Sequence, residues 1–389
     1  MTGSTPGPGH RGRTGAAPVR VRGTDAATGE ELDLWVRDGV FVDPPDRDGA
    51  DRGGEVVELS GWVLPGLVDA HCHIGYSTAG AATLPEAEDQ ARTELAAGVL
   101  AIRDCGSPID TRPLVGRPDL PVLIRAGRHI ARPRRYIREL GVDVEPDQLV
   151  DEVRRQLAYG DGWIKIVGDW IDRAVGDLSP LWPQDVLAQA IAVAHAGGAR
   201  VTTHVFGEDG LDRMLAAGVD CVEHGTGMTD DSIVVLAARG VRVVPTLINI
   251  ANFPSFADAA GRYPTYARHM RDLYARSRDT YRRAADAGVV LHAGTDAGGY
   301  VEHGRIVDEV QALAELGIPP RQVLRQAAHD ARAWLGLGSY RPGDPADLLV
   351  LDTDPARDRA ALAGLRAPAA VLRSGVVRAG RHLPPVAAG

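Results

Sequence analysis

Eight short apolar runs recur along the middle of this 389-residue chain. They span residues 63–70, 99–103, 121–126, 163–167, 201–205, 219–223, 241–247 and 289–295. The segments between them have helical spacing, for example 84–97, 146–159, 183–195, 210–217 and 230–239. Apolar strands that alternate with helices pair in parallel and are buried on both faces. Eight such units predict an α/β fold, a (β/α)8 barrel of the TIM type over residues 63–339.

The two ends of the chain carry a different pattern. Short alternating runs separated by Gly, Asp and Pro occupy residues 17–62, and similar hairpin signals recur in 340–389. We expect these segments to form one small β-sandwich module that flanks the barrel. Residues 1–16 are rich in Gly, Pro, Thr and Arg without an apolar core, so they predict a disordered tail rather than a secretory signal.

Charge and cysteine content limit which partners and which cellular compartment we expect for this chain. The formal charge of −9 argues against nucleic acid and anionic membranes as main partners. The chain has no apolar run long enough to span a bilayer. Its three cysteines, Cys72, Cys105 and Cys221, are odd in number and far apart, which fits free thiols in a reducing cytoplasm. We therefore expect a cytoplasmic protein that acts on a small molecule; a homo-oligomer remains open.

The chain uses lysine only once. Of its 43 Lys and Arg residues, only Lys165 is a lysine, and it lies in the apolar run Trp163-Ile164-Lys165-Ile166-Val167. Unlike a guanidinium, a buried amine can lose its proton. It can then add carbon dioxide to form a carbamate, an anionic ligand able to bridge two metal ions. The alternative is a structural lysine whose ammonium reaches out of a strand end.

Metal-binding residue types end five of the predicted strands. His71 and His73 end the first strand, and alternation puts both on one face while Cys72 faces the other. The other ligand-type residues are Lys165 in strand four, His204 in strand five, His224 in strand six and Asp296 after strand eight. Parallel strands of a barrel converge at their carboxyl ends, where such enzymes place their sites. Each residue alone fits an ordinary strand-end hydrogen bond, but the complete set predicts a metal centre.

These motifs resemble the amidohydrolase superfamily, in the branch of imidazolonepropionase-like proteins and metal-dependent Xaa-Pro dipeptidases. The resemblance covers about residues 55–380. It rests on Pro65-Gly66-Leu67-Val68-Asp69-Ala70-His71-Cys72-His73, Ile164-Lys165-Ile166, Thr203-His204, Glu223-His224-Gly225 and Gly294-Thr295-Asp296-Ala297. The closing segment, from Pro342-Gly343-Asp344 to Leu351-Asp352, is also similar to that family's.

The resemblance implies a binuclear centre. In such members the HxH pair and the aspartate bind one metal ion, which transfers to His71, His73 and Asp296. The two later histidines, His204 and His224, bind the second ion. A carboxylated lysine, here Lys165, and a hydroxide bridge both. Zn²⁺ suits these mixed ligands best, with Mn²⁺ and Fe²⁺ as alternatives.

The activity implied is hydrolysis of a C–N bond in an amide, a cyclic amide or a dipeptide-like substrate. The metal-bridging hydroxide attacks the carbonyl, and Asp296 carries the proton to the leaving nitrogen. Three alternatives stay open: a phosphotriester or lactone hydrolase on the same centre, a mononuclear deaminase with a structural Lys165, and a non-catalytic assembly protein.

Two regions are expected to contact the substrate. After strand three, His129, Arg135 and Tyr136 lie on the mouth side, and Arg135 suits a substrate carboxylate. Tyr300 and His303 follow strand eight. A 40-residue insertion at 248–287, with Phe253 and Phe256 among its aromatic residues, leaves the barrel at the same mouth. It predicts either a lid or a subunit contact.

Overall fold

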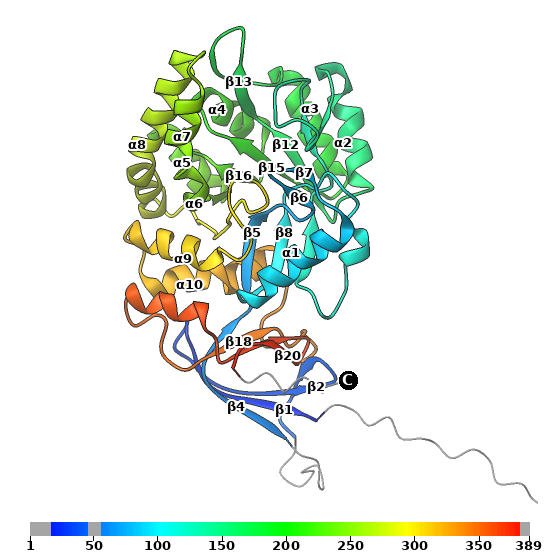
Figure 1. Ribbon diagram of the computed structural model, residues 1–389, viewed down its shortest axis with the longest axis vertical. Helices are drawn as coiled ribbons and strands as arrows, with labels where there is room; N and C mark the ends of the chain where they lie inside the picture. The colour runs from blue at the N-terminus through cyan, green and yellow to red at the C-terminus, as the bar shows by residue number, and fades with distance from the viewer. Residues whose placement is uncertain (1–16, 46–55, 382–389) are drawn as a thin grey trace, which may run out of the picture.

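The computed structural model describes residues 17–45 and 56–381, and over these the chain has a mixed α/β fold. Two parallel sheets lie among the helices, and a larger sheet made from both ends of the chain lies to one side of them (Figure 1). The predicted disordered tail, 1–16, and the last part of the predicted module, 382–389, fall outside the described residues.

The parallel strands agree closely with the apolar runs of the sequence. One sheet has the order β5 (Leu67–Cys72), β8 (Val99–Asp104) and β9 (Val122–Arg125). The other has the order β11 (Gly141–Asp143), β10 (His129–Ala131), β12 (Trp163–Val167), β15 (Arg200–Val205), β16 (Cys221–His224) and β17 (Arg242–Val244). Every residue of β5, β8 and β12 is buried, as expected for parallel strands covered on both faces.

The predicted eighth strand, 289–295, and the two residues after it form isolated bridges rather than a continuous strand. On one side the N–H of Ala70 donates to the carbonyl of Ala293, at 2.9 Å. On the other side the N–H of His292 donates to the carbonyl of Val243, also at 2.9 Å. The segment therefore hydrogen-bonds to β5 and to β17, but its backbone is irregular because Asp296 has a left-handed φ of 60°.

Helices follow the strands at the predicted places. They are α1 (Leu84–Ala96), α2 (Leu149–Leu157), α3 (Gln184–Ala196), α4 (Glu208–Ala217), α5 (Asp230–Arg239), α9 (Ile306–Glu315), α10 (Pro320–Ala327) and α11 (His329–Trp334). Thr83 and Thr229 begin α1 and α5 with capping boxes, which satisfy free backbone N–H groups at each start. No helix within the described residues has both the length and the apolar composition that a bilayer crossing demands.

The insertion and a hairpin extend from the strand ends. The insertion folds as α6 (Leu247–Ile250), α7 (Phe253–Ala259) and the long α8 (Pro264–Asp286). The hairpin β13 (Asp169–Asp172) and β14 (Asp177–Pro180) follows β12, and a two-residue pair, β6 (Tyr76–Ser77) and β7 (Gly80–Ala81), follows β5. These segments lie beyond the carboxyl ends of the parallel strands.

Strands from both ends of the chain form one seven-stranded sheet. Its order is β20 (Val376–Ala379), β19 (Ala370–Arg373), β18 (Leu348–Leu351), β4 (Val57–Pro65), β1 (Val19–Asp25), β2 (Glu31–Arg37) and β3 (Val40–Val42). The antiparallel pairing of β18 with β4 joins the C-terminal strands to the N-terminal ones. The sandwich expected from the sequence is thus a single hydrogen-bonded sheet, with a separate core that includes Val21, Phe41 and Leu348.

Candidate metal centre

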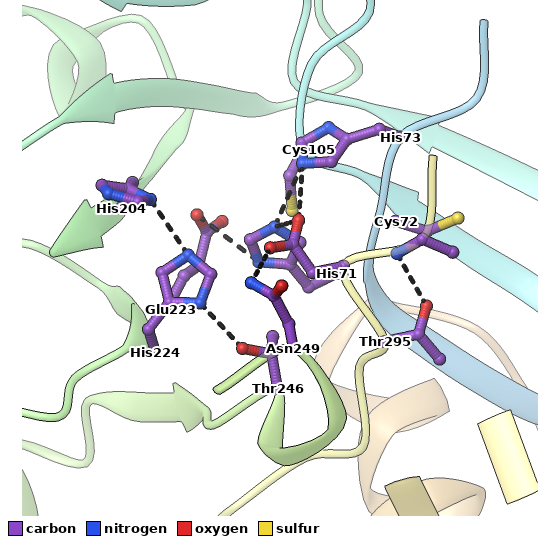
Figure 2. A network of polar contacts seen from close by, with 12 residues as sticks. His71, Cys72, His73, Cys105, His204, Glu223, His224, Thr246, Asn249 and Thr295 are labelled. Atoms are coloured by element: carbon purple, nitrogen blue, oxygen red, sulfur yellow. Dashed lines mark hydrogen bonds and ion pairs between the residues drawn. The ribbon is translucent and has the colours of Figure 1, made fainter. Parts of the chain in front are cut away.

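Six ligand-type side chains gather at the carboxyl ends of the parallel strands, and Figure 2 shows the four histidines among them. They are His71, His73, Lys165, His204, His224 and Asp296. The four imidazoles and the lysine are buried, and the Asp296 side chain is 18% exposed. The sequence predicted that these six residues would converge, and the structure brings them together.

The imidazole nitrogens face one another in two pairs. Nε2 of His71 lies 3.2 Å from Nε2 of His73, and both lie close to Oδ1 of Asp296, at 3.0 and 3.1 Å. Nδ1 of His204 lies 3.0 Å from Nε2 of His224. Ligand atoms of His71, His224 and Asp296 all lie within 4.8 Å of one another. The first group joins the HxH pair to the aspartate, and the second joins the two later histidines.

Neighbouring groups orient the histidine rings. Nδ1 of His73 contacts the carbonyl oxygen of Gly106 at 2.9 Å, and Nδ1 of His224 contacts Oγ1 of Thr246 at 2.7 Å. Each contact directs the Nε2 atom of its ring toward the cluster, as hydrogen bonds around metal ligands do. Nε2 of His204 is buried and has no hydrogen-bond partner. Imidazole nitrogens placed in this way are suitable ligand atoms for a divalent metal ion.

Burial also favours the neutral imidazole that metals bind. It lowers the pKa of His224 to about 3, against the opposing effect of Asp296. Burial and the nearby His224 lower the pKa of His204 well below its usual range. The pKa of the Asp296 carboxyl is well below its usual range because the nearby His71 and His73 outweigh the effect of burial. Burial thus favours the neutral form of His204 and His224, in which an imidazole can bind a metal ion.

Lys165 makes a buried ion pair that the sequence did not predict. Its ammonium pairs with Glu223, whose carboxylate also accepts from Oγ1 of Thr202 at 2.6 Å and lies 3.4 Å from Arg103. Burial alone would raise the pKa of Glu223, but His71, Lys165 and Arg103 together hold it well below its usual range. Charged residues inside apolar strands, Arg103 and Glu223 among them, were the available signal in the sequence.

Asn249 is a second residue that the sequence did not single out. Its side-chain amide donates to Oδ2 of Asp296 at 2.6 Å, and it belongs to the four-residue helix α6. The buried Glu309 accepts from the N–H groups of Leu247 and Ile248 at the start of that helix, at 2.9 and 3.0 Å. Glu309 therefore fixes the helix that presents Asn249 to Asp296.

Three residues at the strand ends have left-handed backbones without being glycine. They are His224, Thr246 and Asp296, with φ of 63°, 50° and 60°. Residues other than glycine are uncommon in this region, and β-branched residues such as threonine are especially so. At each position the chain leaves the strand while directing a polar side chain into the cluster.

A cavity of about 690 Å³ opens above these residues. His73, His204 and Asp296 contribute to its wall, together with residues of the β13–β14 hairpin and of the insertion. Phe256 lines the cavity, whereas Phe253 is fully buried against Phe206 and the core of α8. The insertion thus covers the cluster, and only one of the two phenylalanines contacts the cavity.

Of the five expected substrate contacts, Tyr136 and Tyr300 line the cavity and three residues do not. Arg135 turns instead to the hairpin, where it bonds Asp172 at 2.9 Å and the carbonyl oxygens of Trp170 and Ser179. His303 pairs with the buried Glu94 at 2.9 Å, on the side of β5 that carries Cys72. His129 is fully buried behind the rings of His73 and Tyr136. The first two have partners elsewhere and the third is fully buried, which the chain order alone did not reveal.

Comparison with known proteins places these features in a family. Residues 62–379 match the profile of the amidohydrolase family. The uncharacterized protein Rv2915c of Mycobacterium tuberculosis H37Rv is 52% identical over 346 residues, which covers 89% of this chain and 92% of the relative.

Solved structures share the fold at lower sequence identity. The crystal structure of a Xaa-Pro dipeptidase with methionine bound in its active site is 23% identical, with a TM-score of 0.75 over 93% of this chain and 99% of that one. The A. niger ochratoxinase structure is 18% identical, with a TM-score of 0.76 over 95% of this chain and 97% of that one.

Proposed function

This chain belongs to the amidohydrolase family, and from that membership we propose that it hydrolyses a C–N bond at a centre of two divalent metal ions. The substrate is an amide, a cyclic amide or a dipeptide-like compound. The observation that carries the proposal is the convergence of His71, His73, Lys165, His204, His224 and Asp296 on one cluster beneath a cavity.

The pairing of the side chains suggests how the metals are shared. His71, His73 and Asp296 would hold one ion, and His204 and His224 would hold the other. Lys165, as a carbamate, would supply ligand oxygens to both. Carboxylation would replace the positive charge of Lys165 with a negative one, and Glu223 would keep its contacts with Thr202 and Arg103.

The chain's own residues then have separate roles in the reaction. Bound divalent ions polarise a carbonyl and acidify a water molecule, and zinc suits these ligands best. Asp296 accepts the proton of the attacking water and passes it to the leaving nitrogen. Asn249 keeps one carboxylate oxygen of Asp296 fixed and leaves the other directed at the HxH pair. The aromatic side chains that line the cavity keep bulk water from the reacting bond.

We further propose that the two parallel sheets and residues 289–297 make one (β/α)8 barrel, spanning 63–339. Two observations support it. Residues 289–297 hydrogen-bond to β5 on one side and to β17 on the other. The third barrel strand is divided into β9, which pairs with β8, and β10, which pairs with β12. The described parts of the terminal segments 17–62 and 340–389 then form the flanking β-module.

Metal counting combined with a substrate screen tests the function. We expect two zinc ions per chain after reconstitution, and turnover of an amide but not of lactones or phosphotriesters. His204→Ala should lose one ion and most of the turnover. His195→Ala, an exposed histidine of α3, should keep both. One ion in the parent would favour a deaminase, hydrolysis of lactones or phosphotriesters would favour that class, and full metal content without turnover of any substrate would favour a non-catalytic role.

A further inference from the structure

Aromatic side chains form a large part of the wall of the cavity above the cluster. Its aromatic residues are Tyr76, Tyr136, Trp170, Phe206, Phe256, Tyr263, Tyr266 and Tyr300. They come from segments far apart in the chain: the β6 turn, the loop after β10, the hairpin, the end of β15, the insertion and the loop after Asp296. A cavity of this volume suits a drug-sized molecule, and such a wall suits flat apolar groups.

One part of this wall surrounds His204. The ring centroids of Tyr136, Trp170 and Phe206 lie 5.2, 5.3 and 4.3 Å from that of His204. Trp170 also contacts Tyr136, at 4.8 Å, with the rings inclined at 66°. These three side chains form an aromatic surface beside one of the two proposed metal positions.

A second part lies on the side of Asp296. The rings of Phe256 and Tyr300 are 4.7 Å apart, and they belong to the insertion and to the loop that follows Asp296. Tyr76, after the HxH strand, lies next to Gly299 in that same loop. A substrate whose carbonyl reaches the cluster therefore has aromatic neighbours near both His204 and Asp296.

Charged groups are few among the described residues that line the cavity. Apart from Asp296, the charged residues of the lining are Arg173, Asp258 and Arg262, and all three are exposed. Asp258 is already paired with Arg271, at 2.6 Å. A free dipeptide carries its ammonium and carboxylate within a few bonds of the scissile bond. Burying them without partners beside an aromatic wall is costly.

We propose that the substrate is an amide with bulky aromatic groups on both its acyl and its amine sides, and that free dipeptides are poor substrates. Any charge on this substrate lies at a distal end, within reach of the exposed Arg173 or Arg262. This inference rests on the proposed function and narrows it to one class of amide.

The test compares substrates on the zinc-reconstituted holoenzyme. N-benzyl-2-naphthamide and 2-naphthanilide represent the proposed class, and glycyl-L-proline, L-methionyl-L-proline and acetanilide represent small amides. We expect kcat/KM to be at least tenfold higher for the naphthyl compounds. Equal or higher values for the dipeptides would overturn the inference and leave the proposed hydrolase function intact.

Matched variants test whether the aromatic residues of the cavity wall cause the preference for naphthyl amides. Phe256→Ala and Trp170→Leu should raise KM for the naphthyl amides about tenfold and change that for acetanilide little. Trp170→Leu is preferred to alanine because it keeps an apolar side chain in the hairpin. Tyr274→Ala is the control, since Tyr274 is an exposed aromatic residue of α8 outside the cavity. Equal losses for all substrates would overturn the role of the wall.

If no substrate is hydrolysed, a binding measurement distinguishes the aromatic-amide inference from the proposed hydrolase function. Calorimetric titration with 2-naphthanilide should then show binding to the parent and to Tyr274→Ala, and weaker binding to Trp170→Leu. That result would support the aromatic-amide site while the hydrolase function failed. No binding to the parent would overturn the inference.

Discussion

Lys165 lies among buried charged side chains. Glu223 contacts Lys165, Arg103 and Thr202, so this carboxylate is anchored from three sides. Arg103 in turn donates to the carbonyl of Ala70, the residue just before His71, at 2.7 Å. The lysine is therefore connected to the HxH strand through two other side chains.

Replacing this lysine by arginine separates its chemistry from its charge. Lys165→Arg keeps the positive charge opposite Glu223 but cannot form a carbamate. We expect a folded protein that binds one metal ion per chain instead of two and has little turnover. Metal analysis with circular dichroism checks this. Two ions with near-normal turnover would exclude the carbamate, and poor folding with unchanged metal content would indicate a structural lysine.

Asp296 is expected to be both a ligand and a proton carrier. In Asp296→Asn the amide can still approach the HxH pair but cannot accept a proton. Turnover should fall by the roughly 10²–10⁴-fold typical of lost acid–base catalysis, while some metal remains bound. Steady-state kinetics beside metal analysis measures both, and turnover within a few fold of the parent would rule out the proton-carrying role.

The six clustered residues were predictable because each ends an apolar run, and parallel strands end together. Glu223, Arg103 and Asn249 were not. The first two contact each other across 120 positions of the chain, and their role depends on which face of a buried strand each occupies. Asn249 depends on a four-residue helix whose start is fixed by Glu309, some 60 positions later.

Among the elements, the hairpin and the insertion are joined by a histidine. His269 of α8 contacts Asp177 of β14 at 2.9 Å and Glu208 of α4 at 3.0 Å, and Arg276 also pairs with Glu208. Hydrogen bonding to Glu208, with that to Asp177, raises the pKa of His269 to about 9. His269 thus links the hairpin and the insertion, which both line the cavity, to helix α4.

The contacts that His269 makes with Glu208 and Asp177 should weaken at alkaline pH. Because the folded pKa of His269 is raised, its contribution to stability is complete below the unfolded value near 6.5 and is lost as pH rises through about 9. We expect amide hydrogen exchange in residues 169–180 and 264–286, corrected for the intrinsic pH dependence, to accelerate between pH 7 and 10. His269→Gln should remove most of that pH dependence, and an unchanged profile in this variant would contradict the link.

The two phenylalanines of the insertion should behave differently. Phe253 is fully buried, so Phe253→Ala should cost about 3–5 kcal/mol of unfolding free energy, as large core truncations do. Phe256 is partly buried and lines the cavity, so its truncation should change KM more than stability. Urea unfolding of both variants provides the comparison, and similar stability losses would contradict the assignment. The sequence grouped these residues because both are aromatic and three positions apart.

At the scale of the whole molecule, the cluster draws on strand ends from both parallel sheets. β5 belongs to one sheet and β12, β15 and β16 to the other, with Asp296 on the segment between them. The sequence predicted this convergence and the contribution of both termini to one β-module. It did not predict that the eighth strand would be irregular or that the terminal strands would form one sheet, because both depend on pairing between distant segments.

Metal removal should therefore loosen the whole fold. A ligand at a thousand times its Kd stabilises the native state by about 4 kcal/mol. We expect chelation to lower the Tm by several degrees and added Zn²⁺ to restore it, at one fixed scan rate. His204→Ala should respond less to both treatments. A Tm unchanged by chelation, with metal loss verified, would show that the strand ends are held together without the ions.

The left-handed backbones of His224, Thr246 and Asp296 carry a consequence for how such a protein evolves. Each costs on the order of 1–3 kcal/mol, which glycine would recover. A lineage selected only for heat resistance would therefore accumulate glycine at codon 246, whereas glycine at 224 or 296 would also forfeit the stabilisation that a bound metal ion supplies. Retention of Thr246 across diverging descendants would then be a genetic record of continuous selection for the position of His224.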